Sequence, residues 1–390
     1  MLKALLVNLV ATFVGTRTPA ALAASGFETA LVAYPESWFL HSGHLAQRYR
    51  LRVERGARVE AVGRDLAEII RRWEPDLIVP QDATAYQVLN FLAMPAARAF
   101  VSPELRLRVK RSLGGNRPAA LGALRATLQS TLGELGLPAI PSSAVTCVDD
   151  DVRFADQEGW TVVLKRENSQ NGEGVAICAD RAGAVTVLDD WRGAASVMVQ
   201  KYLDGPVIRH SLSALDGRVL AEVTGIQIHG RRDDPRQAPT VVKLTAIPAV
   251  SEMAARLVGH WRLSGFSGLD FLGDPASGNY YLIDHNPRIN SLSHLGFLVG
   301  RDLSAALHDA LSGQVSTPRP ELVVPDGHVA LFPFEWQRDP RSPYLARCPS
   351  DTPWDDPRLM TAILNRFRVA RDGDAEAPGG EGHSLFQNKA

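Results

Sequence analysis

The chain of 390 residues has little cysteine and almost no net charge, and each feature excludes a class of protein. Its three cysteines, Cys147, Cys178 and Cys348, are odd in number and lack metal-type spacing, so neither a disulfide framework nor a zinc site is expected. The 42 basic and 43 acidic residues leave a net charge of −1, which gives no reason to expect nucleic acid or an anionic membrane as a partner. We therefore expect a cytoplasmic protein with reduced thiols.

Lysine is also scarce, and two familiar nucleotide-binding motifs are missing. The chain has six lysines: Lys3, Lys110, Lys165, Lys201, Lys243 and Lys389. Because arginine supplies nearly all other positive charge, each lysine is a candidate phosphate ligand, for which a compact point charge is suited. No Gly-Lys pair occurs, which excludes a P-loop, and no G-x-G-x-x-G follows the first expected strand, which disfavours a dinucleotide fold.

The first 105 residues alternate between expected strands and helices. Strands over residues 5–10, 29–33 and 77–79, with a helix over 65–73, predict a small parallel sheet with covered faces. The apolar start has an alternative interpretation as a secretory signal peptide. Arg17 and Pro19 fit that pattern poorly, and the run is too short to span a membrane, so a buried strand is favoured.

The rest of the chain predicts a mixed α and β fold. Residues 103–135 are expected to be helical, with breaks at Gly114, Gly115 and Pro118. Strands dominate residues 144–316, with helices expected at 183–191, at 251–262 and after Arg301. The tail from Arg371 has few apolar residues and is expected to be disordered.

The strongest functional signal is an apolar strand that ends in polar residues, Tyr280-Tyr-Leu-Ile-Asp284-His-Asn286-Pro-Arg288. Asp284 and Asn286 share a face because side chains alternate along a strand. A hairpin with the preceding strand would bring Asp270 beside Asp284. Two carboxylates and an amide oxygen suit Mg²⁺, and Arg288 can hold a phosphoryl group or a carboxylate. Solvated acids on a turn-rich hairpin are the alternative.

Two further segments carry weaker signals. Lys165 ends an apolar strand before a loop with Gly172 and Gly174, whose backbone could approach phosphates closely. A plain hairpin with a flexible tip is the alternative. The second segment, Gln200-Lys201-Tyr202-Leu203, is a strand that runs into a hinge, where backbone groups could read an adenine edge. An ordinary exit from a strand is the alternative.

Together and in this order, the three segments resemble the ATP-grasp superfamily of the carboxylate–amine ligase type. The closest local similarity is to biotin carboxylase, in which a Lys-Tyr-Leu hinge is also followed by Arg-His, here Arg209 and His210. The resemblance covers residues 100–316. It implies an α/β domain before the ATP-grasp fold (1–105), an ATP-grasp domain (106–316) with a lid lobe (138–199) and a metal lobe (200–316), a C-terminal extension (317–370) and a tail (371–390).

The resemblance also implies roles for individual residues. ATP and Mg²⁺, which Mn²⁺ could replace, would be the cofactors, with Asp270, Asp284 and Asn286 as metal ligands and Arg288 stabilising the transferring phosphoryl group. Phosphates and adenine would be bound by Arg125, Lys165, Gly172, Gly174, Gln200, Lys201, Tyr202, Leu203 and His210. Arg125 stands where the family usually has a second lysine.

Two positions depart from the family pattern and one role stays open. Asp284 replaces the usual glutamate and shortens that ligand, and Gln200 stands where a glutamate often occurs at the hinge. Mg²⁺ demands tight octahedral geometry, so the shorter ligand favours fewer bound ions. Lys243, on an apolar strand, is a candidate contact for the γ-phosphate, with a solvated strand residue as the alternative.

The expected function is ATP-dependent amide formation from a small-molecule carboxylate and an amine through an acyl phosphate. A bicarbonate-activating enzyme and a regulatory nucleotide-binding protein are the alternatives. Polar residues just past the metal strand, Asn290, Ser291 and Ser293, are candidate contacts for the substrate carboxylate, and the loop at Gln81 and Asp82 is a candidate edge of the site. The aromatic C-terminal stretch is expected to pack on the grasp rather than to cap the substrate. The oligomeric state is left open.

Overall fold

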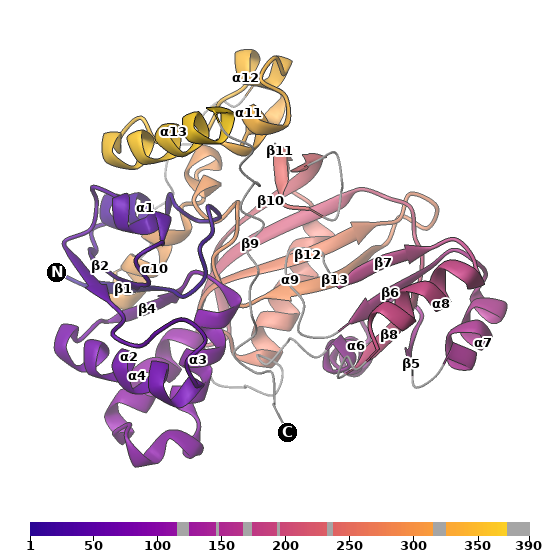
Figure 1. Ribbon diagram of the computed structural model, residues 1–390, viewed down its shortest axis with the longest axis horizontal. Helices are drawn as coiled ribbons and strands as arrows, with labels where there is room; N and C mark the ends of the chain where they lie inside the picture. The colour runs from indigo at the N-terminus through magenta and orange to yellow at the C-terminus, as the bar shows by residue number, and fades with distance from the viewer. Residues whose placement is uncertain are drawn as a thin grey trace.

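The computed structural model describes residues 1–114, 125–145, 148–166, 174–192, 196–231, 237–314 and 325–372. Within these ranges the strands form three sheets, one in an N-terminal α/β unit, one in a small lobe and one in a large central lobe (Figure 1). The mixture of parallel and antiparallel sheets confirms the fold class predicted from the sequence. No helix in the described part of the chain is long and apolar enough to cross a membrane.

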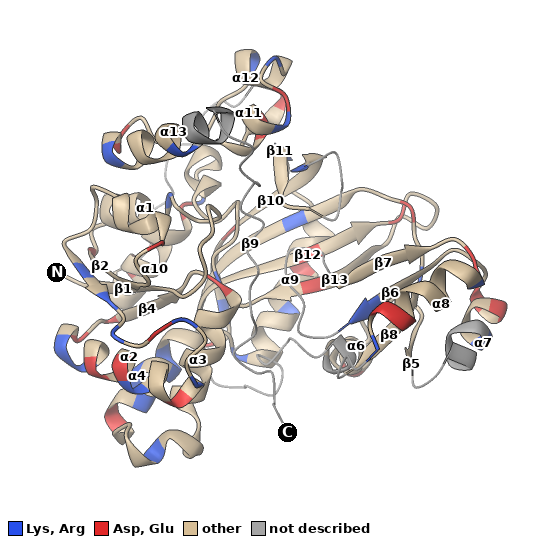
Figure 2. Ribbon diagram, viewed as in Figure 1, with Lys and Arg blue, Asp and Glu red and all other residues tan. Residues whose placement is uncertain are grey.

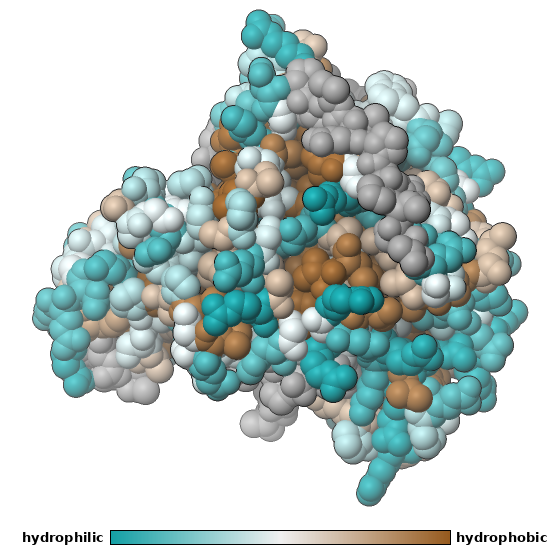
Figure 3. Space-filling model, turned by 180° about the vertical axis from the view of Figure 1, so that it is seen from behind, coloured by the Kyte–Doolittle hydropathy of each residue, from teal (hydrophilic) through white to brown (hydrophobic). Residues whose placement is uncertain are grey.

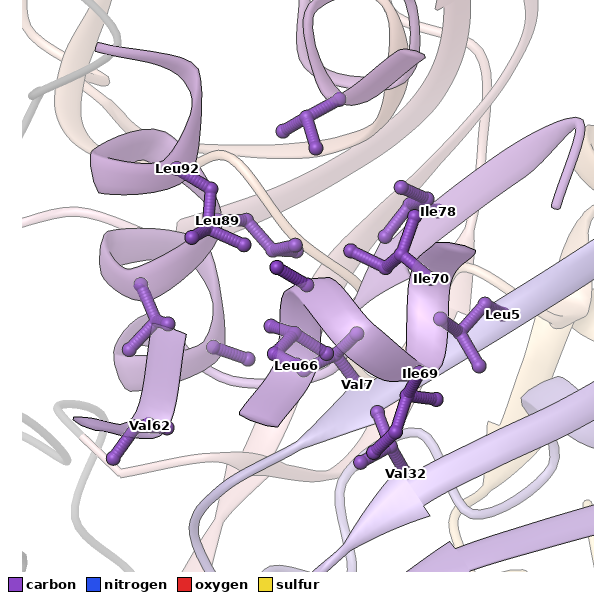
Figure 4. Packing of buried hydrophobic residues seen from close by; sticks show 14 of the residues in the cluster. Leu5, Val7, Val32, Val62, Leu66, Ile69, Ile70, Ile78, Leu89 and Leu92 are labelled. Carbon is purple, nitrogen blue, oxygen red and sulfur yellow. The ribbon is translucent and has the colours of Figure 1, made fainter. Parts of the chain in front are cut away.

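The N-terminal sheet is parallel and has the order β3-β2-β1-β4. Its strands are β1 (Lys3–Asn8), β2 (Glu28–Ala33), β3 (Gln47–Arg50) and β4 (Leu77–Pro80), and its helices include α1 (Thr18–Ala24), α2 (Val59–Trp73), α3 (Ala83–Ala93) and α4 (Pro103–Leu113). Apolar side chains of α2 and α3 pack on alternate residues of β1 and β2, as Figure 4 shows for Leu66, Leu89, Leu5 and Val32. The apolar start of the chain is therefore a buried strand.

The small lobe is an antiparallel sheet of order β5-β8-β6-β7. Its elements are β5 (Ser142–Val145), α7 (Val148–Glu158), β6 (Val162–Arg166), β7 (Val175–Cys178), α8 (Arg181–Asp190) and β8 (Val197–Lys201). Val162, Leu164 and Val199 pack with α7 and α8 on one face of this sheet. Residues that alternate with them, including Lys165 and Gln200, therefore lie on the opposite face.

The central lobe is built on a sheet of order β13-β12-β9-β10-β11-β14. Its elements are β9 (Val207–Leu215), β10 (Arg218–Gly230), β11 (Pro239–Leu244), α9 (Pro248–Trp261), β12 (Gly265–Gly273), β13 (Tyr280–Asn286), α10 (Leu303–Leu311) and β14 (His328–Ala330). Ile208, Leu269 and Phe271 pack with α9 and with α6 (Arg125–Glu134) in one core. The other face packs partly against the N-terminal unit and α10 in a second core.

The C-terminal segment joins both large units. Strand β14 extends the central sheet by pairing with β11, and α11 (Phe334–Arg338), α12 (Pro343–Arg347) and α13 (Pro357–Asp372) follow it. Helix α13 contacts the short 3-10 helix η1 (Trp38–His41) of the N-terminal unit, and Figure 1 shows α13 beside that unit. From behind, Figure 3 shows apolar surface gathered near the middle of the molecule, within a largely hydrophilic exterior.

Candidate active site

A pair of aspartates lies on the β12–β13 hairpin. Asp270 and Asp284 are directly opposite each other in the antiparallel pairing, as the sequence predicted. Figure 2 shows acidic positions on this part of the central sheet. A β-bulge follows this pair, and it lets Asp284 face the same side as Asp270 while Leu282 pairs with Phe271 on the opposite, α9-covered side. Asp270 is buried and Asp284 is half-buried, so both carboxylates converge on the face that α9 leaves uncovered.

Asn286 and Arg288 extend this pair along the end of β13. The Asn286 Nδ2 atom donates to Asp284 Oδ2 at 3.1 Å and lies 3.5 Å from Asp270 Oδ2. The Asn286 Oδ1 atom accepts from the Arg288 guanidinium at 3.0 Å. The four polar residues that the sequence singled out at the metal strand therefore form one continuous hydrogen-bonded group.

Arg209 belongs to the same group, although its sequence context alone did not point there. It is the β9 residue opposite Asp270, and its Nη1 atom donates to Asp270 Oδ2 at 2.6 Å. Its Nε and Nη2 atoms donate to Gln227 Oε1 at 2.9 and 2.7 Å. The available signal was a single arginine within strand β9, but the partner of that arginine depends on which strands pair.

The pKa of the Asp270 carboxyl is raised, and it reflects opposing influences. Burial raises the pKa of the Asp270 carboxyl, the Arg209 guanidinium lowers it, and the Asp284 carboxylate raises it again. Arg288 lowers it further from the edge of the group. A cation placed between the two carboxylates would favour their charged forms, in the same way as the guanidinium groups do.

The donor set fits a hard divalent cation with one adjustment. No group of three or more His, Cys, Asp and Glu side chains gathers within the described ranges, so the candidate consists of two carboxylates and one amide. Oxygen ligands of this kind suit Mg²⁺, which takes its remaining ligands from water and phosphate. Asn286 presents its nitrogen to the carboxylates, so it would ligate a metal only after its amide turns.

The small lobe supplies two residues on the face that its helices leave free. Lys165 is in register with Met198, and Gln200 is in register with Val163, which places both polar side chains on one side of the sheet. Both are buried, and the Gln200 Nε2 atom has no hydrogen-bond partner among the residues that the structure describes. Gly174 is a buried residue just before β7, whereas Gly172 and the side chain of Arg125 lie outside the described residues.

The hinge between the lobes follows β8 directly. Lys201 is in register with Val162 on the helix-covered face, and its Nζ atom pairs with Glu158 of α7 at 3.2 Å. Tyr202 and Leu203 are half-buried as the chain leaves the sheet. The Lys201 side chain thus points away from Lys165, so the two lysines lie on opposite faces of this sheet.

Two predicted residues lie on the other face of the central sheet. His210 is fully buried beside Phe271, its Nδ1 atom is 2.8 Å from Thr224 Oγ1, and burial lowers its pKa to about 4. Lys243 is exposed and in register with Ile226, which packs against the α9 core. The structure does not bring either side chain to the aspartate pair.

The residues after β13 form a compact turn. Asn290 Oδ1 accepts from Ser211 and from Ser293 Oγ, the latter at 3.1 Å, and Ser293 is buried while Ser291 is half-buried. Asn290 therefore holds this turn against β9. Asp82, which was predicted to lie at the edge of the site, is buried and accepts from the backbone of Leu9 at 2.7 Å. It therefore holds the backbone that follows β1.

Comparisons with known proteins agree with this architecture. No family model matches the chain. It is 25% identical over 280 residues to the arginine-specific large chain of carbamoyl phosphate synthase from Geobacillus stearothermophilus, which covers 65% of this chain and 24% of that protein. The chain thus spans about a quarter of the length of the curated relatives that it matches.

Solved structures resemble most of the chain. N5-carboxyaminoimidazole synthetase from Staphylococcus aureus, complexed with ADP, has a TM-score of 0.60 at 12% identity and matches 83% of this chain and 80% of its own. The biotin carboxylase domain of 2-oxoglutarate carboxylase from Hydrogenobacter thermophilus, in complex with MgADP, ADP and bicarbonate, has a TM-score of 0.57 at 16% identity, with 81% and 71% covered. The chain therefore has the ATP-grasp fold, as the sequence predicted.

Proposed function

We propose that this protein is an ATP-dependent carboxylate–amine ligase, which forms an amide through an acyl phosphate and releases ADP and phosphate. The observation that carries the proposal is the pairing of Asp270 with Asp284 on the sheet face opposite α9, with Arg288 beside them. The substrates would be a small carboxylic acid and an amine. We propose a cytoplasmic location, where ATP is available.

Each lobe has a distinct part in this mechanism. Lys165 would hold the phosphates from the small lobe, while the backbone of residues 200–203 would contact adenine. Asp270, Asp284 and Asn286 would hold Mg²⁺, which neutralises phosphate charge and orients the γ-phosphate. Arg288 would stabilise charge on the phosphoryl group as a carboxylate oxygen attacks it in line. Approach of the small lobe would exclude water, which otherwise hydrolyses the acyl phosphate.

Activation of bicarbonate is the second candidate function. Two observations favour it: the similar biotin carboxylase domain was solved with bicarbonate, and a carbamoyl phosphate synthase is among the relatives. Bicarbonate would be phosphorylated at the same site, so the same Asp270, Asp284 and Arg288 would act. The two functions differ only in the acid that accepts the phosphoryl group.

Hydroxylamine trapping tests the proposal without knowledge of the amine. The protein is incubated with ATP, Mg²⁺, hydroxylamine and each of a panel of carboxylic acids. A hydroxamate formed together with an equal amount of ADP is the expected result for one acid. ADP formed with bicarbonate alone would favour the second function, and no ADP with any acid would contradict both.

Asp284→Asn tests the role of the aspartate pair in this reaction. Loss of one carboxylate should reduce hydroxamate and ADP formation on the order of 100-fold, because the metal loses a charged ligand. Nucleotide binding, measured by calorimetry without Mg²⁺, should persist. Unchanged turnover in this variant would show that the aspartate pair is not the catalytic metal site.

A further inference from the structure

A groove lies between the N-terminal unit and α13, where the helix runs beside that unit (Figure 1). Its volume is about 520 Å³, and clefts that bind small molecules measure roughly 300–1,000 Å³. The groove shares no residue with the candidate active site, so an inference about it does not depend on the proposed function. Its lining comes from η1, β3 and the start of α13: Leu40, His41, Arg48, Pro357, Arg358 and Thr361.

The charged residues of this lining are all basic. Arg48, Arg358 and His41 reach the groove from three different elements, and no acidic residue lines it. In the described part of the chain, neither of these two arginines has a carboxylate within ion-pair distance, whereas Arg52 of the same unit pairs with Asp65 at 2.7 Å. The groove therefore gathers positive charge that the described residues do not neutralise.

The guanidinium of Arg48 is held in place without losing its charge. Its Nε atom donates to the backbone oxygen of Leu40 at 3.1 Å, its Nη1 atom to that of Leu45 at 3.1 Å, and its Nη2 atom to that of Ser42. These acceptors are uncharged carbonyl groups. Because a guanidinium has five N–H groups and three of them are used here, two remain available to a ligand.

The acidic residues that precede α13 have other partners. Asp355 pairs with Arg17 at 2.5 Å and with His44 at 3.4 Å. Asp356 is buried and accepts from Ser42 Oγ at 2.7 Å. Neither carboxylate lines the groove, so the positive charges that face it repel each other unless an anion lies between them.

We propose that this groove is a binding site for a compact dianion, a phosphate group or a dicarboxylate. Arg48 would contact the anion from the N-terminal unit and Arg358 from α13, since guanidinium groups bind phosphate and carboxylate oxygens through paired N–H groups. Leu40 and Pro357 supply apolar surface beside the charge. A ligand held in this way joins the C-terminal segment to the N-terminal unit and stabilises their contact.

Calorimetry with inorganic phosphate and with succinate tests the proposal. Each probe is titrated into the full chain, and sodium chloride keeps the ionic strength constant because salt screens such contacts. We expect saturable binding of at least one probe to the wild type, and the probe that binds more tightly identifies the kind of dianion. In Arg358→Gln this binding should weaken about tenfold, because charge-assisted hydrogen bonds are lost.

Arg366→Gln is the matched control. Arg366 is an exposed arginine of the same helix that does not line the groove, so this variant should bind the probe as the wild type does. Equal losses in the two variants would show that only the net charge of the chain matters, which would overturn the proposal. Wild-type affinity in Arg358→Gln, or no binding of either probe to the wild type, would also overturn it.

Hydrogen exchange locates the bound anion. The tighter probe should slow the exchange of backbone amides in β3 and at the start of α13 in the wild type. Slower exchange confined to the strands around Asp270 and Asp284 would place the anion at the candidate active site and would overturn the proposal. Measurements on the wild type can therefore decide the question even if Arg358→Gln does not fold.

Discussion

At the scale of the residue, successive side chains of β9 point to opposite faces of the central sheet, which places charged and neutral polar groups on different faces. Arg209 and Ser211 face the aspartate side, whereas His210 between them faces the α9 core. A buried imidazole of this kind is held neutral because burial penalises its charged form. Arg209 therefore contacts the aspartate pair, whereas the ring of its neighbour His210 is buried on the opposite face, beside Phe271 and Thr224.

His210 should make the stability of the protein pH-dependent. Its pKa is lowered to about 4 in the folded state, while an unfolded histidine keeps a pKa near 6.5. The unfolded state therefore binds a proton that the folded state does not, and stability is lost as the pH falls from about 6.5 towards 4. The loss should reach about 3 kcal/mol for this residue.

Urea unfolding between pH 7.5 and pH 4.5 measures this effect. His210→Gln removes the titrating group, so the slope of its unfolding free energy against pH should be shallower by up to about 1.4 kcal/mol per pH unit. Parallel curves for the two proteins would show that His210 takes up its proton equally in both states.

At the scale of the element, the hinge after β8 contacts the β12–β13 hairpin through a glycine. A Cβ atom on Gly205 would lie 1.8 Å from the backbone oxygen of Gly273, at the end of β12. The backbone nitrogen of Gly273 also donates to Pro206 at 3.0 Å. The strand that carries Asp270 and the end of the hinge therefore touch through their backbones, which leaves no room for a side chain.

Gly205→Ala should perturb both parts. The backbone must move to accept the methyl group, which should cost about 1–3 kcal/mol of stability and weaken nucleotide binding several-fold. Thermal unfolding and calorimetry with ADP measure the two effects.

Gly133→Ala is the matched control for this change. Gly133 lies exposed on α6 with nothing within 4 Å of its Cβ position, so alanine should be neutral or should stabilise by up to about 1 kcal/mol. Equal effects of the two substitutions would show that the contact with Gly273 is not the cause of the changes in stability and nucleotide binding.

At the scale of the whole molecule, Asp356 links the C-terminal segment to the N-terminal unit. It is buried, and its carboxylate accepts from Ser42 Oγ at 2.7 Å and from the backbone of Gly43 at 3.0 Å. Burial alone would raise the pKa of this carboxyl, but these hydrogen bonds lower it below its ordinary value. The C-terminal segment is thus anchored on the N-terminal unit as well as on β11.

Asp356→Asn should destabilise the protein by about 1–3 kcal/mol. The neutral amide would weaken the hydrogen bonds from Ser42 and Gly43, and its NH₂ group would face one of these two donors. Asp355→Asn is the control: Asp355 is 49% exposed and pairs with Arg17 at the surface, so its loss should change stability by less than about 1 kcal/mol. Chemical unfolding of both variants compares them. A larger loss in Asp355→Asn would show that the surface ion pair, and not Asp356, anchors the segment.

Local pattern was sufficient for the elements that carry a strong periodic signal. The predicted strands at residues 29–33 and 77–79, the helix ending at Trp73 and the hairpin that pairs Asp270 with Asp284 are all present. They were predictable because strand alternation and turn residues act over a few neighbouring positions. The short strand β3 was missed, because Gln47–Arg50 is polar and gains its structure only by pairing with β2.

Contacts between distant segments decided the rest. Arg209 meets Asp270, 61 positions away, only because β9 lies between β10 and β12 in the sheet. Whether the side chains of Lys201, His210 and Lys243 lie on the helix-covered face or on the other face depends in the same way on which side of each sheet the helices cover. A single sequence specifies the direction in which side chains alternate, but the packing of helices on sheets determines which of the two faces becomes core and which becomes the site.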